Sequence, residues 1–375
     1  MKIGLLKEPN FEHRVALLPE AVHKLVKKGH EVLFEPEAGV KAFASDKEYE
    51  DEGAKKTGRA EILTNAEVIL SIQPVAKNEV VAFSNGQIIV GAYNPLVNEE
   101  LVEQFKEKGL TLLSLDNLPR TTRAQSMDIL SSMATVAGYK SVLEAANRVP
   151  RFFPMFMTAA GTIKPAKMLI LGAGVAGLQA VGTARKLGAV VEVFDVRAAV
   201  KEEVESLGAK FIEVEGAKDE KDAGGYAVEQ SEEFKQRQKA KIQEHAIKSD
   251  VIITTAQIPG KPAPKLITKE SIEQMKPGSV IIDIASSSGG NTELTEDNKV
   301  VNHNGVIIVG NSLLPAEMPV DASKMIGNNV VNFLEILNAG NGEMKLNLED
   351  EIVAGCTVTH NGELVSERIK NAYKN

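Results

Sequence analysis

The sequence is poor in the residues that build disulfides and metal sites. Its single cysteine, Cys356, excludes an internal disulfide and a metal cluster held by several cysteines. The six histidines form no H-x-x-x-H or H-E-x-x-H pattern, so no metal site is expected. No G-x-S-x-G element is present, which disfavours a serine hydrolase of that type.

Long apolar runs are also missing. No window approaches the ~18 consecutive apolar residues of a membrane span, and the N-terminal residues become charged too early for a secretory signal. The net charge of −8 argues against a nucleic-acid partner, because such partners need a basic surface. The composition therefore predicts a cytoplasmic protein, and its 375 residues are enough for two domains.

Short apolar runs alternate with helix-period segments along most of the chain. The expected strands are 2–8, 30–35, 67–72, 87–93, 111–116, 211–215, 250–255, 279–284 and 305–310. The expected helices include 19–29, 46–56, 98–109, 127–149 and 321–337. Short connections between such elements favour mostly parallel sheets with helices on both faces.

This alternation predicts an α/β protein of two doubly wound, Rossmann-like domains with parallel sheets, joined by long helices. One domain is expected to contain residues 1–127 with about 320–375, and the other about 128–319. A ligand crevice is expected between the two domains, at the carboxyl ends of the strands.

Residues 167–197 carry the most specific local pattern. A strand-like run leads into Gly172, Gly174 and Gly177, which form G-x-G-x-x-G, and a helix-period segment and a second strand follow. In such a turn the glycines allow a tight bend, a close approach to a pyrophosphate, and close packing of the helix on its strand. Asp195, 18 residues after Gly177, is placed to accept hydrogen bonds from the adenosine ribose and to repel a 2′-phosphate. The pattern favours NAD(H) over NADP(H); the alternative is a purely structural strand–turn–helix.

A polar segment follows the strand at 111–116. It contains Arg120, Arg123, Gln125, Ser126 and Asp128 within nine positions. The arginine at its start suits a phosphate or carboxylate, and Gln125 suits a carboxamide or ribose, as does Ser131 a little further on. Asp128 has two open interpretations, a cap on the following helix or a ligand contact.

Two other polar segments are less specific. Glu8 ends the first expected strand, and His13 and Arg14 follow it; the arginine is able to hold an anion, and the histidine is expected at the surface. Residues 216–245 begin with a polar, glycine-containing stretch, which is either a mobile loop or an ordinary solvated loop before an exposed helix.

Longer motifs give the chain a family resemblance from end to end. They are KEPNFEHRVALLPE, RAQSMDILSS, GYKSV, FPMFMTAAGT, LGAGVAGLQAVGTARKLGAVVEVFDVR, AGGYA, TTAQIPGKPAPKLIT and MKPGSVIIDIA. Together they resemble the alanine dehydrogenase/transhydrogenase superfamily, and within it the NAD(H)-binding α subunits of proton-translocating NAD(P) transhydrogenases.

Three positions separate the two branches of this superfamily. Alanine dehydrogenases that resemble this chain have a lysine, a histidine and an aspartate where it has Gln73, Tyr93 and Ser287. Amino-acid oxidation needs such proton-handling groups, whereas hydride transfer between two nicotinamides does not. The resemblance therefore favours a transhydrogenase subunit over a soluble alanine-dehydrogenase-like enzyme. A non-catalytic NAD-sensing module is a third possibility.

The resemblance also implies roles for individual residues. It implies that the nicotinamide end of the cofactor is positioned for catalysis by four residues, Arg120, Gln125, Asp128 and Ser131. It implies cofactor contacts from Gly172, Gly174, Val175, Gly177, Asp195, Val196, Arg197, Gly225, Tyr226, Thr255, Thr121 and Thr122. Tyr226 would lie on a mobile loop that closes over the nucleotide, and a metal is not implied.

The expected assembly follows from the same resemblance. The chain resembles the short form of the α subunit, in which the membrane-spanning subunit and the NADP(H)-binding β subunit are separate polypeptides. It would bind NAD(H) as a homodimer and transfer hydride to or from NADP(H) held by the partner. This transfer would be coupled to proton movement across the inner (cell) membrane. Alone it would be inactive, and in the cell it would lie in the cytoplasm at the membrane, through its partners.

Overall fold

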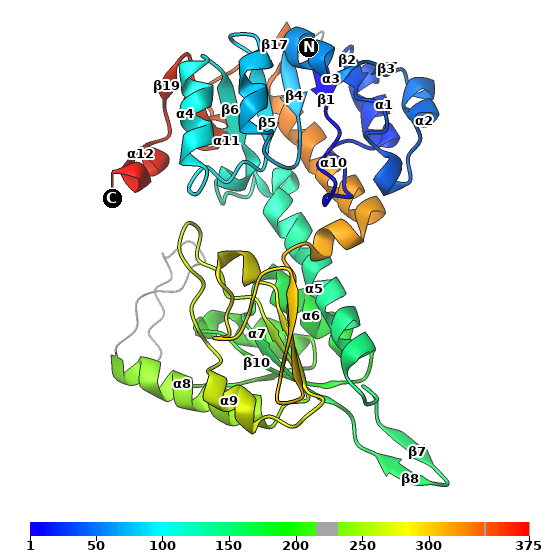
Figure 1. The fold of residues 1–375 in the computed structure, drawn as a ribbon, viewed down its shortest axis with the longest axis vertical. Helices are drawn as coiled ribbons and strands as arrows, with labels where there is room; N and C mark the ends of the chain where they lie inside the picture. The colour runs from blue at the N-terminus through cyan, green and yellow to red at the C-terminus, as the bar shows by residue number, and fades with distance from the viewer. Residues whose placement is uncertain (215–231, 341–342, 375) are drawn as a thin grey trace. The chain divides into compact units, whose positions relative to one another are not determined.

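The computed structural model describes residues 1–214, 232–340 and 343–374. These form two compact units, Met1–Met133 with Pro315–Asn375, and Ala134–Leu314 (Figure 1). We call them unit 1 and unit 2. Two predicted site residues, Gly225 and Tyr226, lie outside the described residues, as does the rest of 215–231.

Unit 1 is built on an eight-stranded sheet with the order β19-β18-β6-β5-β4-β1-β2-β3. Its strands are β1 Lys2–Leu5, β2 Glu31–Phe34, β3 Lys55–Lys56, β4 Val68–Leu70, β5 Ile88–Gly91, β6 Thr111–Ser114, β18 Thr357–His360 and β19 Glu363–Leu364. The first six are parallel, whereas β18 and β19 form an antiparallel edge beside β6. The central strands β4, β5 and β6 are buried on both faces, which explains their continuous apolar sequence.

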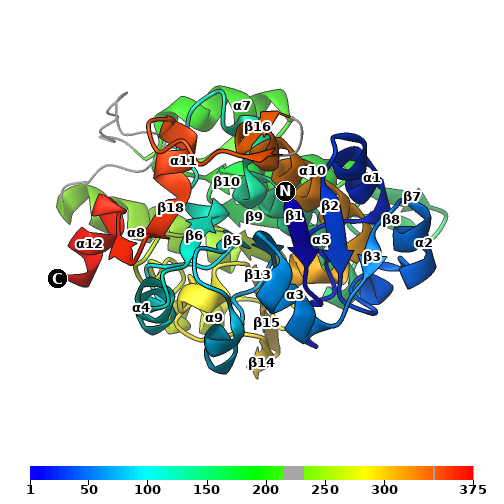
Figure 2. The same ribbon diagram turned by 90° about the horizontal axis from the view of Figure 1, so that it is seen from above.

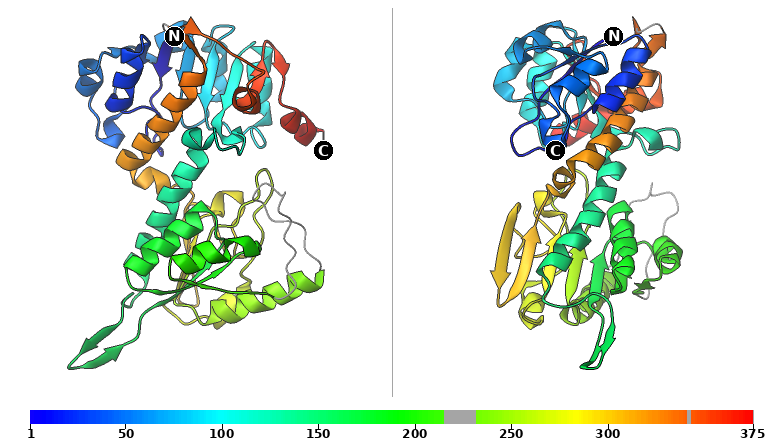
Figure 3. Two further views of the ribbon diagram at one scale, coloured as in Figure 1. Left: turned by 180° about the vertical axis from the view of Figure 1, so that it is seen from behind. Right: turned by 90° about the vertical axis from the view of Figure 1, so that its right-hand side faces the viewer.

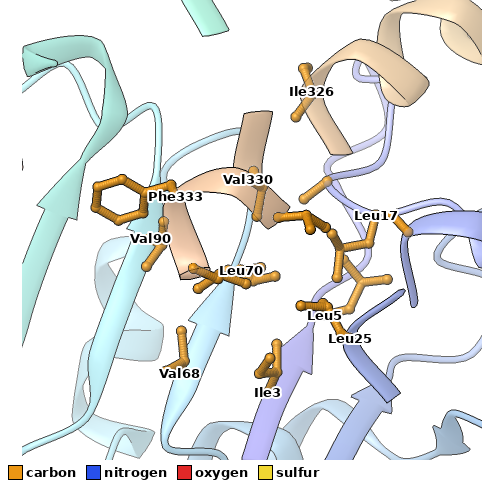
Figure 4. Close-up of a cluster of buried hydrophobic side chains, with 14 of the residues drawn as sticks. Ile3, Leu5, Leu17, Leu25, Val68, Leu70, Val90, Ile326, Val330 and Phe333 are labelled. Atoms are coloured by element: carbon orange, nitrogen blue, oxygen red, sulfur yellow. The ribbon is translucent and has the colours of Figure 1, made fainter. Parts of the chain in front are cut away.

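Helices cover both faces of this sheet (Figure 2). The helices of unit 1 are α1 Pro19–Lys27, α2 Asp46–Asp51, α3 Arg59–Asn65, α4 Glu99–Glu107, α10 Pro319–Ile336, α11 Glu351–Cys356 and α12 Glu367–Tyr373. One face packs on α1, α10 and α11, and the other on α3, α4 and α12. Figure 4 shows the first of these cores, where Val330 and Phe333 of α10 lie against Leu70 and Val90 of the sheet.

Unit 2 has a seven-stranded sheet with the order β11-β10-β9-β12-β13-β15-β14. Its strands are β9 Lys167–Leu171, β10 Val190–Phe194, β11 Lys210–Phe211, β12 Val251–Thr254, β13 Val280–Asp283, β14 Lys299–His303 and β15 Val306–Gly310. All pairs are parallel except β14 with β15. The strand order reverses between β9 and β12, which is the topological switch point at which such sheets bind ligands.

The helices of unit 2 also lie on both faces of its sheet. They are α5 Ile129–Arg148, which begins in unit 1, α6 Val175–Lys186, α7 Lys201–Ser206, α8 Glu232–Ile247 and α9 Lys269–Gln274. One core contains residues of α5, α6 and α7, and the opposite core contains residues of α8 and α9. The predicted α/β class with two mainly parallel, doubly wound sheets is therefore confirmed.

An exposed hairpin precedes β9. Its strands, β7 Phe156–Thr158 and β8 Gly161–Ile163, pair only with each other and extend from unit 2 (Figure 3). Apolar side chains are exposed along it and just before it, with Met157 77% and Met155 58% exposed. Phe152 and Phe156 pack edge to face, with ring centroids 4.6 Å apart.

The sequence prediction was wrong in detail at the sheet edges. It gave 211–215 as one strand, but β11 is only Lys210–Phe211, and residues 212–214 belong to no strand. It also missed the antiparallel strands β14, β18 and β19. A further two-stranded pair, β16 Asn338–Gly340 with β17 Glu343–Met344, follows α10. Within the described ranges, no helix is long and apolar enough to cross a membrane.

Candidate nucleotide-binding site

The three positions of the turn between β9 and α6 are glycine for different structural reasons. Gly172 has a φ of 105°, and a Cβ on it would lie 2.3 Å from Thr255 Oγ1. A Cβ on Gly177 would lie 1.8 Å from the carbonyl oxygen of Gly172. Gly174 has an ordinary extended backbone, and a Cβ on it would meet no atom within 4 Å. The fold therefore requires glycine at the first and third positions but not at the second.

Gly174 is also the N-cap of α6. It has no side chain that could bond the first N–H groups of the helix. An uncapped helix N-terminus at the end of a parallel strand presents backbone donors and the positive end of the helix dipole to an anion. Val175, the first residue of α6, is 43% exposed at this end. The turn can thus accept a phosphate with its backbone alone.

Asp195 lies directly after β10, beside this turn. Its carboxylate accepts four hydrogen bonds, from Ala173 N at 2.7 Å and from Arg197 N, Nε and Nη2 at 2.8, 2.9 and 2.9 Å. These bonds use the approximately four acceptor positions of a carboxylate. The ribose of a bound nucleotide would therefore have to displace part of the Arg197 guanidinium. Val196, which lies between Asp195 and Arg197 in the sequence, is partly buried and packs against the core that contains residues of α8 and α9.

Thr255 follows β12, on the other side of β9. Its hydroxyl donates to the carbonyl oxygens of Leu171 and Gly172 at 3.2 and 3.3 Å. Thr255 thereby fixes the glycine turn from the side opposite Asp195. Unit 2 thus brings together the predicted residues Gly172, Gly174, Val175, Gly177, Asp195, Val196, Arg197 and Thr255 around the carboxyl ends of β9, β10 and β12.

The polar turn of unit 1 contains a short helix, η4 Gln125–Met127, before α5. The Asp128 carboxylate accepts from Ser131 N at 2.9 Å and from Ser131 Oγ at 2.5 Å, so it caps α5. Gln125 is exposed on η4. The capping interpretation of Asp128 is thus observed, and it leaves Asp128 and Ser131 as one bonded pair near Gln125.

Two asparagines of α10 hold this turn. Asn329 Nδ2 and Asn332 Nδ2 donate to the carbonyl oxygen of Ser126 at 2.8 and 2.9 Å, and Ser132 Oγ donates to Asn329 Oδ1 at 2.7 Å. Neither asparagine is predictable from the sequence, because about 200 residues separate them from the turn and no local signal marks such a contact.

The residues before η4 differ in environment. Arg120 and Thr122 are exposed, whereas the hydroxyl oxygen of Thr121 is buried and has no hydrogen-bond partner in the described structure. Arg123 forms an ion pair with Asp350, the N-cap of α11. The charge of Arg123 is therefore paired within unit 1.

A buried ionic cluster follows β1 in unit 1. Arg14, only 9% exposed, donates to Glu12 from Nε and Nη2 at 2.7 and 2.5 Å, and Gln73 Nε2 donates to Glu12 at 2.8 Å. Burial opposes the charge on Glu12, but the bonds and charge of Arg14 hold the pKa of Glu12 below its usual range. Glu8 accepts from Ile72 N and Gln73 N at 2.5 and 3.0 Å. Arg14 was expected to hold an anion, and the anion it holds here is Glu12.

Burial dominates the other titrating groups of this region. It raises the pKa of Glu8 to about 7, despite the two backbone donors. It also raises the pKa of Tyr93, whose hydroxyl lies 2.8 Å from Ser71 Oγ. His13 and Ser287 are exposed, and no group of His, Cys, Asp and Glu in the described ranges is arranged to hold a metal ion.

Family models and relatives agree on what the chain is similar to. The alanine dehydrogenase/PNT N-terminal domain matches residues 4–137, and the alanine dehydrogenase/PNT C-terminal domain matches residues 141–367. The first part of NAD(P) transhydrogenase subunit alpha from Rhodospirillum rubrum is 45% identical over 97% of this chain and 98% of that protein. The protein of the same description from Rickettsia prowazekii is 42% identical, over 100% and 98% of the two chains.

Solved structures agree with these relatives. The transhydrogenase from Sinorhizobium meliloti superimposes with a TM-score of 0.89 at 43% identity, over 97% of this chain and 100% of that chain. An L-alanine dehydrogenase superimposes with a TM-score of 0.83 at 26% identity, over 100% and 99%. The alanine dehydrogenases are thus similar in fold but more distant in sequence. The chain belongs to the alanine dehydrogenase/PNT family and, within it, to the NAD(P) transhydrogenase alpha subunits.

Proposed function

We propose that unit 2 binds NAD(H) at the carboxyl ends of β9, β10 and β12. The observation that carries this proposal is Gly174, the one glycine of the turn whose missing side chain the fold does not need. A pyrophosphate that contacts the backbone at the start of α6 does need it. Asp195, beside the turn, would accept the ribose hydroxyls and repel a 2′-phosphate, so NAD(H) is preferred over NADP(H).

The proposed reaction is direct transfer of a hydride between two nicotinamide rings. A hydride, one proton with two electrons, leaves C4 of NADH on this chain and joins C4 of NADP⁺ on a partner subunit. The products are NAD⁺ and NADPH, and no substrate proton is abstracted. Catalysis then depends on holding the rings at ~3 to 3.5 Å and excluding water. Arg120, Gln125, Asp128 and Ser131 are proposed to position the NADH ring.

The side chains near the ends of β4 and β5 support this chemistry over amino-acid oxidation. Where the resembling alanine dehydrogenases have a lysine, Gln73 donates a neutral amide hydrogen to Glu12. Tyr93 is buried and bonded to Ser71, and burial keeps its hydroxyl protonated by raising its pKa. Neither group is suited to exchange protons with an imine at neutral pH.

The relatives that are described as the first part of an alpha subunit support an assembly with further subunits. We propose that NADP(H) is held by a separate β subunit, that another subunit spans the membrane, and that hydride transfer is coupled to proton movement through it. The chain would then lie on the cytoplasmic face of the cell membrane through these partners. Without them it would bind NADH and transfer no hydride.

The decisive experiment measures hydride transfer from NADH to an NADP⁺ analogue. The purified chain is assayed alone and then with an NADP(H)-binding transhydrogenase domain, with pyruvate plus ammonia as a parallel substrate pair. We expect transfer only when the domain is added. NADH oxidation that depends on pyruvate, by the chain alone, would show an alanine dehydrogenase instead. NADH binding without transfer in either assay would indicate an NAD-sensing module.

We also propose that the chain is a homodimer and that the β7–β8 hairpin contributes to its interface. The support is the exposed apolar side chains on the hairpin, with Met157 77% exposed. Sedimentation velocity of Met157→Asp should show a weakened dimer. Val81, 78% exposed on unit 1, supplies the matched control Val81→Asp. A hairpin variant that sediments like the unsubstituted protein would contradict the proposed interface.

A further inference from the structure

One buried asparagine connects the two loops that follow β12 and β13. The Asn291 side chain is fully buried, with its Oδ1 accepting from Ala256 N at 3.0 Å. Its Nδ2 donates to Ala256 O at 2.8 Å and to Pro264 O at 2.9 Å. Its backbone oxygen accepts from Leu266 N and Ile267 N at 2.7 and 3.1 Å. A single residue therefore fixes both ends of the loop 255–266.

Asp283 anchors Asn291 in turn. This carboxylate, fully buried at the end of β13, accepts from Asn291 N at 2.7 Å and from Thr295 Oγ1 at 2.6 Å. Gly290 lies between, with a φ of 77°, and a Cβ on it would lie 2.7 Å from Asp283 Oδ2. The loop after β13 is thus folded tightly around the Asp283 carboxylate, which gives Asn291 a fixed position relative to the sheet.

The loop that Asn291 fixes is part of the proposed NAD(H) site. It begins at Thr255, which bonds the carbonyl oxygen of Gly172. Residues 257–262 in its middle are exposed. In a doubly wound sheet the adenosine lies on the β10 side of the switch point, and the other half of the dinucleotide lies on the β12 side. The loop therefore belongs to the nicotinamide half, whereas Asp195 belongs to the adenosine half.

We infer that Asn291 is a positioning residue for the nicotinamide half of NAD(H). The inference rests on the proposed function, and it assigns Asn291 no contact with the cofactor. Asn291 acts through Ala256 and Pro264, whose backbone groups it holds, and so fixes where the loop 255–266 meets the ring. Both hydrogen-bonding groups of Ala256 depend on this one carboxamide.

The test compares two ligands that share the adenosine half. NADH and ADP are titrated into the full chain and into Asn291→Ala. We expect the NADH affinity to fall about tenfold, the effect of one or two lost buried hydrogen bonds, while the ADP affinity changes less than about twofold. With the NADP(H)-binding domain added, hydride transfer at saturating NADH should also slow, because the ring is less well fixed.

Two further variants separate positioning from general destabilisation. Lys265 donates from Nζ to Gly289 O and Thr292 O at 2.5 and 2.8 Å, and so also connects the loop after β12 to the loop after β13. Because its side chain is exposed, Lys265→Ala should weaken this connection, which we call the tether, only mildly. We expect the same selective loss for NADH, about two- to threefold. Val280→Ala, a cavity at the amino-terminal end of β13 in the core that contains residues of α5, α6 and α7, should lower the melting temperature without changing either affinity.

The outcomes are distinct. An equal loss of NADH and ADP affinity in Asn291→Ala would show a merely structural role, and unchanged NADH affinity in both tether variants would overturn the inference. If Asn291→Ala does not fold, Lys265→Ala decides alone. Absence of NADH binding by the unsubstituted chain would overturn the proposed function itself, and this inference with it.

Discussion

Gly174→Ala separates the requirements of the fold from those of the ligand. The new Cβ would meet no atom within 4 Å, and the backbone at Gly174, with φ −79° and ψ −169°, is allowed for alanine. The loss of unfolded-state entropy stabilises such a variant by about 0.4–1 kcal/mol, whereas alanine is a poorer N-cap than glycine by a similar amount. We therefore expect a melting temperature close to that of the unsubstituted chain.

The same methyl group should weaken NADH binding strongly. It would stand where the backbone at the start of α6 is proposed to approach the pyrophosphate. Loss of one hydrogen bond to a charged group costs about 1.5–3 kcal/mol, which corresponds to roughly a 10- to 150-fold weaker affinity. The assay is a titration followed by NADH fluorescence, with thermal unfolding of the same samples.

Two glycines within α6 supply controls with opposite expected effects on the free energy of unfolding. A Cβ on Gly177 would lie 1.8 Å from the backbone oxygen of Gly172, so Gly177→Ala must separate α6 from β9 and should be strongly destabilised, by about 3 kcal/mol or more. A Cβ on Gly182 would meet nothing within 4 Å, so Gly182→Ala should gain about 0.5–1 kcal/mol from helix propensity and bind NADH normally. Normal NADH binding by Gly174→Ala would contradict the proposed contact with the pyrophosphate, and a stability as low as that of Gly177→Ala would show that the fold does need this glycine.

Three further predictions concern single side chains. Gln125→Ala should keep NADH affinity within about twofold but lower single-turnover hydride transfer by tenfold or more, as a positioning group would; an unchanged rate would remove Gln125 from the site. Asp195→Asn should lower the affinity for NADH about tenfold. It should also reduce the ratio of NADH to NADPH affinity, measured by parallel titrations, because the charge that repels a 2′-phosphate is gone. Folded Glu8 has a pKa of about 7 against 4.5 as its ordinary value, so the free energy of unfolding should fall as pH rises from 4.5 through 7. Urea unfolding at pH 5.5 and pH 8 should show that Glu8→Gln loses this dependence.

The elements that the sequence predicted well are those with local causes. The central strands are unbroken apolar runs because parallel strands are buried on both faces. The strand–turn–helix at Gly172 follows from glycine spacing, since a side chain at Gly177 would collide with the backbone oxygen of Gly172, only a few residues earlier. Such constraints determine which residue types are allowed at these positions, so they can be recognised from the sequence.

The features that were missed depend on contacts between distant residues. The bonds from Asn329 and Asn332 to Ser126, and from Asn291 to Ala256, join residues that no periodicity connects. The antiparallel edge strand β18 pairs with β6, more than 240 residues earlier. Asp128 shows a different limit, because an acid before a helix suits a cap and a ligand contact equally well until its bond to Ser131 is seen.

The ionic cluster of unit 1 bears on why hydride transfer, and not amino-acid oxidation, suits this chain. Arg14 and Glu12 form a buried pair of zero net charge, to which Gln73 adds a neutral donor. The lysine that the resembling alanine dehydrogenases have at position 73 would add a second cation, a surplus of one positive charge over glutamine, with which to hold an oxo-acid carboxylate. With glutamine that surplus is absent, and the desolvation cost of a buried, uncompensated carboxylate would then oppose binding of such a substrate. The proposed contribution of unit 1 is therefore the turn at Gln125 and Asp128, which acts by positioning the ring and not by proton transfer.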